Sequence, residues 1–311
     1  MGALLLALPA AVGGLCAAVD YASLLKTAST AAKAAGHIMT RKLGAEVVKT
    51  KYNPRDLLTA VDAECQSEVS RIILEAYPSH TFLGEEDVAA GSAASGSALA
   101  EVIQDEWLWV VDPIDGTTNF ASGMPLATVS IALCVPAIPS SAAAFRGEVV
   151  VGVVYDPYRD ELFCAATDRP TTINDLPVRV SDALELGDAV VAAGSPPDPR
   201  SLAPSLRAVV ALSPQVRTVR MLGSAALMMA WVAAGRLTAY FEPDLNSWDT
   251  AAGSLLVRQA GGCVTSLEGI EYSLDTRSLL CSNARTHKSL LGVIQDAGVR
   301  GLDESDAHDA L

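Results

Sequence analysis

Basic side chains are scarce in this sequence. Its 311 residues include 22 lysines and arginines against 36 aspartates and glutamates, which gives a formal net charge of −14. This balance excludes a nucleic-acid-binding protein that relies on a basic surface. It also disfavours phosphate binding, unless carboxylates collect divalent cations that reverse the local field. We therefore expect a metal site and no nucleic-acid partner.

Closely spaced cysteines are also missing. The six cysteines are scattered along the chain, so no pair has the spacing of a zinc ligand set or of a redox motif. Cys134 and Cys263 lie in apolar, strand-like segments, where a thiol behaves as a small buried apolar group. We assign none of the six a chemical role.

Charge is absent from residues 2–19, which are rich in alanine and leucine. The stretch is short for a membrane span, and it lacks the preceding basic residues of a secretory signal and the arginine and serine of a transit peptide. We set residues 1–17 apart as an apolar N-terminal extension and expect no stable membrane span. Whether the compartment is cytoplasmic or organellar depends on whether this extension is a targeting segment.

The first half of the chain mixes helical and strand patterns. Apolar positions recur at helical spacing over 18–39 and 59–76, and Pro78 would end the second helix. Apolar or alternating runs predict strands over 81–84, 107–111, 128–135, 149–155 and 161–165. Alanine, glycine and serine dominate residues 88–99, which predicts a mobile surface loop, and 136–146 are expected to form an exposed insertion.

After about Asp182 short strands alternate with helices. The expected elements follow in order at 189–193, 202–212, 224–234, 237–241 and 248–260, with Gly261-Gly262 as the stop of the last helix. This alternation predicts helices on both faces of a sheet. We divide the chain into the extension, an N-terminal α+β half over 18–182, a C-terminal α/β half over 183–300 and an acidic tail over 301–311.

The segment from Asp112 to Asn119 has the residue types of a metal and phosphate site. Asp112 and Asp115 lie three residues apart at the end of an apolar run, and two such carboxylates can bind divalent ions. Gly116 and the threonines after it could present backbone N–H groups to a phosphate at the start of a helix. The same residues also fit a capped turn that satisfies local backbone groups.

Three acidic residues elsewhere are open to the same two interpretations. Glu85 follows an apolar strand and is either a metal ligand or a solvated charge. Asp249 lies at the start of an apolar helix, where the helix dipole also stabilises an acid. Asp62 would ordinarily cap the helix that follows Thr59. None of the three decides the question alone.

Taken in order, these residues resemble the signatures of the inositol monophosphatase family. The motifs are Gly84-Glu85-Glu86, Asp112-Pro-Ile-Asp115-Gly-Thr117 and Trp248-Asp249-Thr-Ala-Ala-Gly253. Lys51, the run Asn53-Pro54-Arg-Asp56-Leu and Thr59-Ala-Val-Asp62 match the early segment of that family. The similarity covers roughly residues 18–298, and several motifs in the right order argue against chance agreement.

The resemblance implies an α/β fold, the layered αβαβα sandwich of inositol monophosphatases and fructose bisphosphatases, usually as a homodimer. It also implies Mg²⁺ ions held by Glu85, Asp112, the Ile114 carbonyl, Asp115 and Asp249. Thr117 and Asp62, assisted by Glu85, would orient and deprotonate the attacking water. Such metal ions would lower the pKa of water and stabilise both ends of an in-line displacement at phosphorus.

The implied substrate is a small phosphorylated polyol or sugar, with inositol monophosphate first. Backbone N–H groups of Gly116 and Thr117 would hold its phosphate. The groups implied for the alcohol half are Asp115, Gly223, Ser224, Ala225 and Glu242, and Lys51 would balance charge near the metals. A surface carboxylate and a solvated lysine remain the alternatives for Glu242 and Lys51. Lithium sensitivity is implied by the resemblance alone.

The sequence departs from the family pattern in one hairpin. Residues 167–181 keep Asn174 but lack the glycines usual before Val180-Ser181, so a reshaped hairpin is expected. The segments 88–100 and 136–146 also look long.

Two groups of rival functions stay open. Relatives on the same scaffold act on histidinol phosphate, fructose bisphosphate or 3′-phosphoadenosine phosphates, and a non-catalytic relative would bind metal or ligand without turnover. Loss of an expected catalytic or metal-binding residue would favour the non-catalytic relative, and all of them are present.

Overall fold

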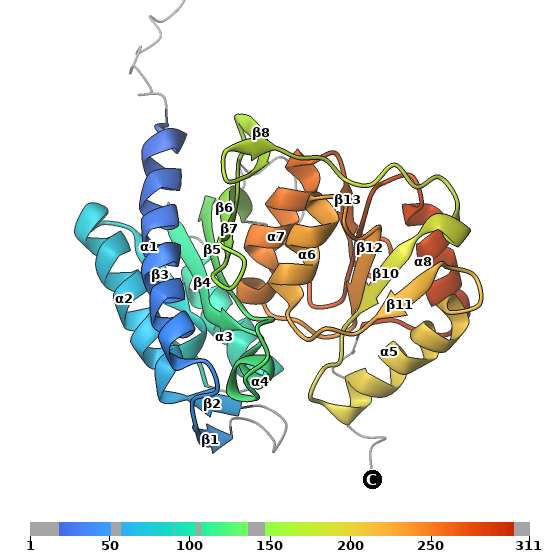
Figure 1. Ribbon diagram of the computed structural model, residues 1–311, viewed down its shortest axis with the longest axis horizontal. Helices are drawn as coiled ribbons and strands as arrows, with labels where there is room; N and C mark the ends of the chain where they lie inside the picture. Colours follow the sequence, from blue (N-terminus) through green and yellow to red (C-terminus); the bar gives the residue numbers. More distant parts are fainter. Residues whose placement is uncertain (1–18, 51–56, 90, 104–106, 136–146, 302–311) are drawn as a thin grey trace, which may run out of the picture.

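The computed structural model describes residues 19–50, 57–89, 91–103, 107–135 and 147–301. Over these residues helices and sheets alternate in five layers, which Figure 1 shows nearly edge-on. This arrangement confirms the expected αβαβα sandwich. The extension at 1–17, Lys51 and the insertion at 136–146 lie outside the described residues.

The first layer is a pair of helices, α1 (Tyr21–Lys42) and α2 (Ala60–Ala76). An apolar stripe of α1, rich in alanine, is buried against the first sheet and α2. Helix α2 begins at Ala60 with Thr59 as its cap, as predicted, and ends two residues before Pro78. A small antiparallel pair, β1 (Val47–Thr50) and β2 (Leu57–Thr59), joins the two helices.

The second layer is a seven-stranded sheet. Its strands, in spatial and chain order, are β3 (Thr81–Gly84), β4 (Leu108–Asp115), β5 (Thr128–Val135), β6 (Glu148–Asp156), β7 (Glu161–Ala166), β8 (Arg169–Ile173) and β9 (Leu176–Pro177). Side chains alternate between its faces, so Trp109 and Val111 of β4 pack toward α1 and α2. Leu108 and Val110 face the opposite core.

The third layer consists of α6 (Ala225–Ala233) and α7 (Ser247–Gln259). Both helices lie between the two sheets, which explains why α6 is buried almost throughout. The core that they share with both sheets is the largest of the described chain, so the two halves are joined by apolar packing.

The fourth layer is a five-stranded sheet in the order β11-β10-β12-β14-β13. Its strands are β10 (Val190–Ala193), β11 (Thr218–Arg220), β12 (Ala239–Glu242), β13 (Cys263–Thr265) and β14 (Leu279–Ser282). The last layer, α5 (Pro199–Leu212) and α8 (His287–Asp296), covers its outer face. Helices therefore lie on both faces of this sheet, as predicted.

One sequence prediction was wrong. Much of the segment expected to be a mobile loop at 88–99 belongs to a helix, α3 (Ser92–Val102), which follows a 3-10 turn, η1 (Glu85–Asp87). Leu99 of α3 is buried in the core and Ser95 bonds to a distant arginine. These tertiary contacts stabilise a helix that the alanine, glycine and serine composition could not reveal.

The hairpin at 167–181 forms without the missing glycines. Asn174 and Asp175 both take the left-handed backbone conformation, with φ of 47° and 66°. Such consecutive positive φ angles make the two-residue turn that connects β8 to β9. Asn174 is one of the few non-glycine residues that tolerate this conformation, and its side chain also bonds Leu162 and Asp160.

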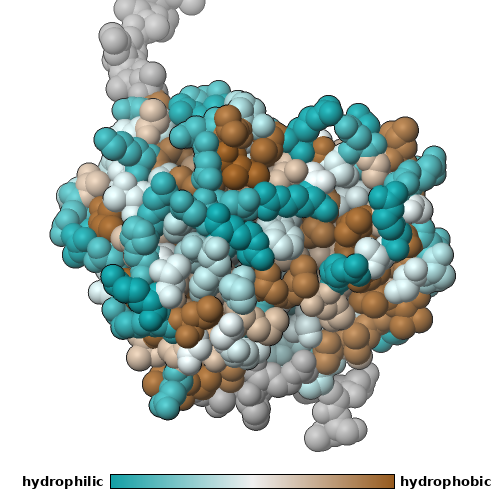
Figure 2. Space-filling model, in the orientation of Figure 1, coloured by the Kyte–Doolittle hydropathy of each residue, from teal (hydrophilic) through white to brown (hydrophobic). Residues whose placement is uncertain are grey.

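The surface mixes hydrophilic and apolar residues over the face shown in Figure 2. Among the described residues, no helix has both the length and the apolar character needed to cross a membrane. Two short elements complete the fold, the helix α4 (Thr117–Ala121) and the 3-10 turn η2 (Leu186–Asp188).

Candidate active site

Three carboxylates meet where the seven-stranded sheet faces the start of α7. Asp112 and Asp115 come from the end of β4, and Asp249 lies in the first turn of α7. One oxygen from each lies within 4.8 Å of the others. Asp112 and Asp115 are buried and Asp249 is half-buried. Oxygen ligands grouped in this way suit a hard divalent cation such as Mg²⁺.

A break in strand pairing explains how two carboxylates three residues apart reach one cluster. In a regular strand such residues point to opposite faces of the sheet. Strand β4 pairs regularly with β5 as far as Asp112, and the register then shifts before Asp115. The backbone N–H of Ile114 donates to Oδ1 of Asp112 at 2.9 Å within this irregular stretch.

Burial and like charge disfavour ionisation of the cluster. Burial raises the pKa of Asp115 to about 6, and the nearby charge of Glu85 adds to the rise. The pKa of Asp249 also lies well above its usual range, because of burial first and then repulsion by Asp115 and Glu85. Glu85, at the start of η1, is therefore electrostatically part of the same site. A divalent cation would offset this repulsion.

Asp115 also connects the two halves of the chain. Its carboxylate accepts hydrogen bonds from the Ser224 hydroxyl and from the N–H groups of Ala225 and Ala226, at 3.2 and 2.7 Å. These groups begin α6, so the carboxylate lies at the positive end of that helix dipole. Ser224 and Ala225, expected from the resemblance to contact substrate, surround Asp115 here.

The two carboxylate oxygens of Asp62 contact different residues. Oδ2 accepts hydrogen bonds from the backbone N–H and the hydroxyl of Thr59, which caps α2 as the sequence predicts. Oδ1 lies 3.2 Å from the hydroxyl of Thr117. The same hydroxyl lies 3.1 Å from the Ile114 carbonyl. The helix cap that the sequence predicts for Asp62 is confirmed, and it leaves the second oxygen in contact with Thr117.

Gly116 lets these segments approach one another. Its φ of +96° belongs to the left-handed region, where glycine is favoured. A Cβ at this position would lie 2.9 Å from the Leu126 carbonyl oxygen and 3.2 Å from that of Gly223. The backbone that follows Asp115 is therefore pressed against the loop that precedes α6.

Asn119 is a positioning residue that we did not single out in the sequence. Its Nδ2 donates to the carbonyls of Leu126 and Leu222, at 2.8 and 2.6 Å. It thereby ties α4 to the loop before α6, next to Gly223. Its place inside the Asp112–Asn119 motif was the available signal, but its partner at Leu222 is 103 residues away.

Glu242 ends β12 in the second half of the site. The Tyr240 hydroxyl donates to its carboxylate, and the carboxyl group occupies space left by the missing side chain of Gly194. Burial raises the pKa of Glu242 to about 8, and repulsion by Asp115 and Asp244 adds to the rise. Repulsion by Asp115 implies that Glu242 lies near the acid cluster. This burial argues against a simple surface carboxylate.

Known proteins resemble this chain over most of its length. The model of the inositol monophosphatase family matches residues 20–298. A Pasteurella multocida protein named Nus factor SuhB is 35% identical, over 88% of this chain and 96% of its own. Inositol monophosphatase 2 of Solanum lycopersicum is 37% identical, over 81% and 87% respectively.

The similarity extends to three dimensions. The solved structure of the inositol monophosphatase from Anabaena has a TM-score of 0.74 and 32% identity, over 89% of this chain and 97% of that one. These matches confirm the family recognised in the sequence and the expected class of enzyme, a phosphatase of this type. By fold, by motifs and by overall similarity, the chain belongs to the inositol monophosphatase family.

Proposed function

We propose that this enzyme is a Mg²⁺-dependent phosphatase of small phosphorylated polyols, with inositol monophosphate as its preferred substrate. The observation that supports it most directly is the group of Asp112, Asp115 and Asp249 oxygens within 4.8 Å of one another. A second supporting observation is the contact between the Thr117 hydroxyl and Asp62. An acidic protein needs such a metal site before it can accept a dianionic phosphate ester.

The metal site in this proposal consists of Glu85, Asp112, Asp115, Asp249 and the carbonyl of Ile114. When bound there, Mg²⁺ would supply charge neutralisation for the phosphate and acidify a coordinated water. The carboxylates would hold that charge in place. Burial raises the pKa values of Asp115 and Asp249, and repulsion between the carboxylates, which a bound cation would offset, adds to the rise.

The attacking water is oriented by Thr117 and Asp62. The threonine hydroxyl accepts a hydrogen bond from the water while donating its own hydrogen to Oδ1 of Asp62. Asp62 accepts the displaced proton through this hydroxyl, assisted by Glu85, as a general base does. Backbone N–H groups of Gly116 and Thr117 hold the phosphate oxygens, since the glycine exposes the backbone at the start of α4.

The alcohol half of the substrate lies toward the second half of the chain. Glu242 accepts hydrogen bonds from ring hydroxyls, and Tyr240 holds its carboxylate in place. Asp115 and the start of α6, with Gly223, Ser224 and Ala225, complete this side. A buried carboxylate that needs donors favours a polyhydroxylated alcohol. Lys51 stays a proposed charge-balancing group outside the described residues.

A substrate panel tests the proposal. Phosphate release would be measured from inositol monophosphate, histidinol phosphate, fructose bisphosphate and 3′-phosphoadenosine phosphate, each with Mg²⁺ and with chelator. We expect inositol monophosphate to have the highest kcat/KM, and only with Mg²⁺. Far higher turnover of histidinol phosphate would overturn inositol monophosphate as the proposed substrate. If Mg²⁺ stimulated phosphate release from none of the four compounds, the non-catalytic alternative would be favoured.

Two further properties implied by the family belong to the same proposal. We expect the enzyme to be inhibited by lithium, which a titration of LiCl into the phosphate-release assay would test. We also expect a homodimer, which sedimentation equilibrium would distinguish from the 32.3 kDa monomer.

A further inference from the structure

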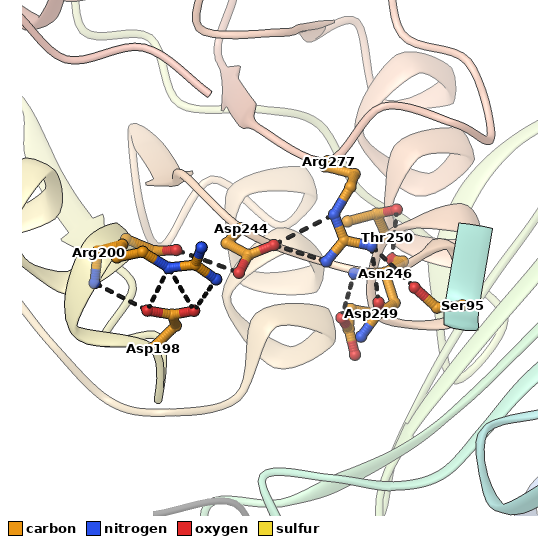
Figure 3. A network of polar contacts seen from close by, with 9 residues as sticks. Ser95, Asp198, Arg200, Asp244, Asn246, Asp249, Thr250 and Arg277 are labelled. Carbon is orange, nitrogen blue, oxygen red and sulfur yellow. Dashed lines mark hydrogen bonds and ion pairs between the residues drawn. The ribbon is translucent and has the colours of Figure 1, made fainter. Parts of the chain in front are cut away.

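Arg277 bonds residues of two other segments, and Asn246 links it to Asp249 of the acid cluster (Figure 3). Arg277 precedes β14, and its guanidinium forms a partly buried ion pair with Asp244. Nε and Nη2 both donate to Oδ1 of Asp244, at 3.2 and 2.6 Å. Oδ2 of Asp244 accepts instead from the Ser201 hydroxyl of α5, at 3.1 Å. The pair is thus anchored on the outer helix layer.

The remaining nitrogen of the guanidinium reaches a second segment, α3, and a second residue of the turn that carries Asp244. Nη1 donates to the Ser95 hydroxyl of α3 at 2.9 Å and to Oδ1 of Asn246 at 3.0 Å. The carbonyl of Arg277 also accepts from the N–H of Leu245, at 2.8 Å. The turn at 244–246 is therefore held by both the backbone and the side chain of Arg277.

Asn246 connects this arginine to the candidate metal site. It is the residue that begins α7, and its backbone N–H donates to Oδ2 of Asp249 at 2.6 Å. One residue thus accepts from Arg277 with its side chain and donates to a metal-site carboxylate with its backbone. A shift of Asn246 would move one oxygen of Asp249.

Ser95 connects the arginine to the other side of the site. It lies in α3, which follows closely on the η1 turn that carries Glu85. Arg277 thus bonds both α3 and the turn that leads into α7, the two segments next to Glu85 and Asp249. A cation with a fixed, planar set of donors is suited to keep both segments together.

We propose that Arg277 is a positioning residue of the metal site, which holds the start of α7 against α3 so that Asp249 stays beside Asp112 and Asp115. This role rests on the proposed function, because it requires that the cluster binds Mg²⁺. Arg277 itself bonds Asn246, Asp244 and Ser95, and it acts on the cluster through them.

Mg²⁺ titration by isothermal calorimetry tests this role, with thermal unfolding measured on the same proteins. The variants are Arg277→Gln, Arg277→Lys and the control Arg236→Gln. Arg236 forms a bidentate ion pair with Glu161. The side chains of this pair are 39% and 20% exposed, which is similar to the 33% and 14% of Arg277 and Asp244. Loss of Arg236 should destabilise the fold comparably without touching the cluster.

We expect Arg277→Gln to weaken Mg²⁺ binding roughly ten- to a hundredfold, as loss of an outer-shell partner does. Arg277→Lys should restore only part of the loss, because a compact ammonium group lacks the planar fork that reaches Asp244, Asn246 and Ser95 at once. Arg236→Gln should bind Mg²⁺ like the wild type. Phosphate release should need correspondingly more Mg²⁺ in Arg277→Gln.

Three outcomes would overturn the proposal, each in a different way. Wild-type Mg²⁺ affinity in Arg277→Gln would show that the arginine is only structural. Full recovery in Arg277→Lys would show that its charge acts without the bridging geometry. Absence of Mg²⁺ binding in the wild-type chain would overturn the proposed metal site itself, and the role of Arg277 with it. Should Arg277→Gln fail to fold, Arg277→Lys alone decides the matter: weakened Mg²⁺ binding supports the proposal, and wild-type affinity overturns it.

Discussion

The hydroxyl of Thr117 lies 3.2 Å from Oδ1 of Asp62, although 55 residues separate them in the chain. Asp62 reaches this position because its other oxygen caps α2, which fixes the side chain to a helix terminus. Thr117 reaches it because Gly116 turns the backbone sharply after β4. The pair that we propose to orient and deprotonate water is therefore held by local structure on both sides.

Thr117→Val should abolish most of the activity while leaving the fold intact. The valine fills the same space but cannot relay a proton, so kcat should fall about 10²- to 10⁴-fold. The unfolding free energy should drop by only about 1 kcal/mol, the net value of a hydrogen bond. Steady-state phosphate release and urea unfolding measure the two effects. Thr118→Val, at the exposed neighbouring residue, is the control. If Thr117→Val turned over substrate as fast as Thr118→Val, the proposed role of Thr117 would be refuted.

Asp112→Asn should remove metal binding without unfolding the protein. The amide keeps the shape of the side chain but loses the charge that holds a divalent cation, so Mg²⁺ affinity should fall by at least about tenfold. Calorimetric Mg²⁺ titration and phosphate release would measure it. The control is Asp87→Asn, which neutralises an exposed acid of the η1 turn. Near-normal turnover in Asp112→Asn would show that Asp112 is not a metal ligand.

The chelator-treated protein should lose stability as the pH rises from about 4.5 to about 8. Glu242 has its pKa raised to about 8 in the fold, against 4.5 for the free group. Between these values the folded state keeps a proton that the unfolded state has released, so increasing pH favours unfolding. Glu242→Gln cannot titrate and should show a smaller fall. Thermal unfolding in EDTA over this range would test it, and equal slopes for both proteins would contradict it.

Glu242→Gln should also change substrate preference. The amide keeps only one acceptor oxygen and places an NH₂ donor where the carboxylate had its second oxygen, so one ring hydroxyl loses its proposed acceptor, which would raise KM for inositol monophosphate by about tenfold. The KM for p-nitrophenyl phosphate, which has no hydroxyls, should change little. An equal rise for both substrates would show that Glu242 supports the site as a whole.

Gly116→Ala should cost more stability than Gly123→Ala. Both glycines have positive φ, so alanine is strained by about 1–2 kcal/mol at either position. Only at Gly116 would the new Cβ also press on the Leu126 and Gly223 carbonyls, whereas nothing lies within 4 Å at Gly123. Denaturant unfolding of the two variants gives the difference, and phosphate release should fall only in Gly116→Ala. Equal losses would show that the close approach contributes nothing.

Interactions between near neighbours could be predicted from the sequence. Thr59 and Asp62 have the spacing of a helix cap, and the cap forms as expected. The strand over 128–135 and the helix that follows Thr59 have clear apolar periods, and the structure has both. Local hydrogen bonds and alternating burial depend on spacing along the chain, which the sequence states directly.

The sequence also determined the family and its candidate metal ligands, because they lie in ordered motifs. Only the tertiary structure decided what holds them. Asp115 lies at the start of α6, which begins more than a hundred residues later, and Arg277 bonds Ser95 across 182 residues. Helix α3 was missed for the same reason. Contacts over such distances depend on how the two large sheets and the helices around them pack, and that packing leaves no periodic signal in the residues that it brings together.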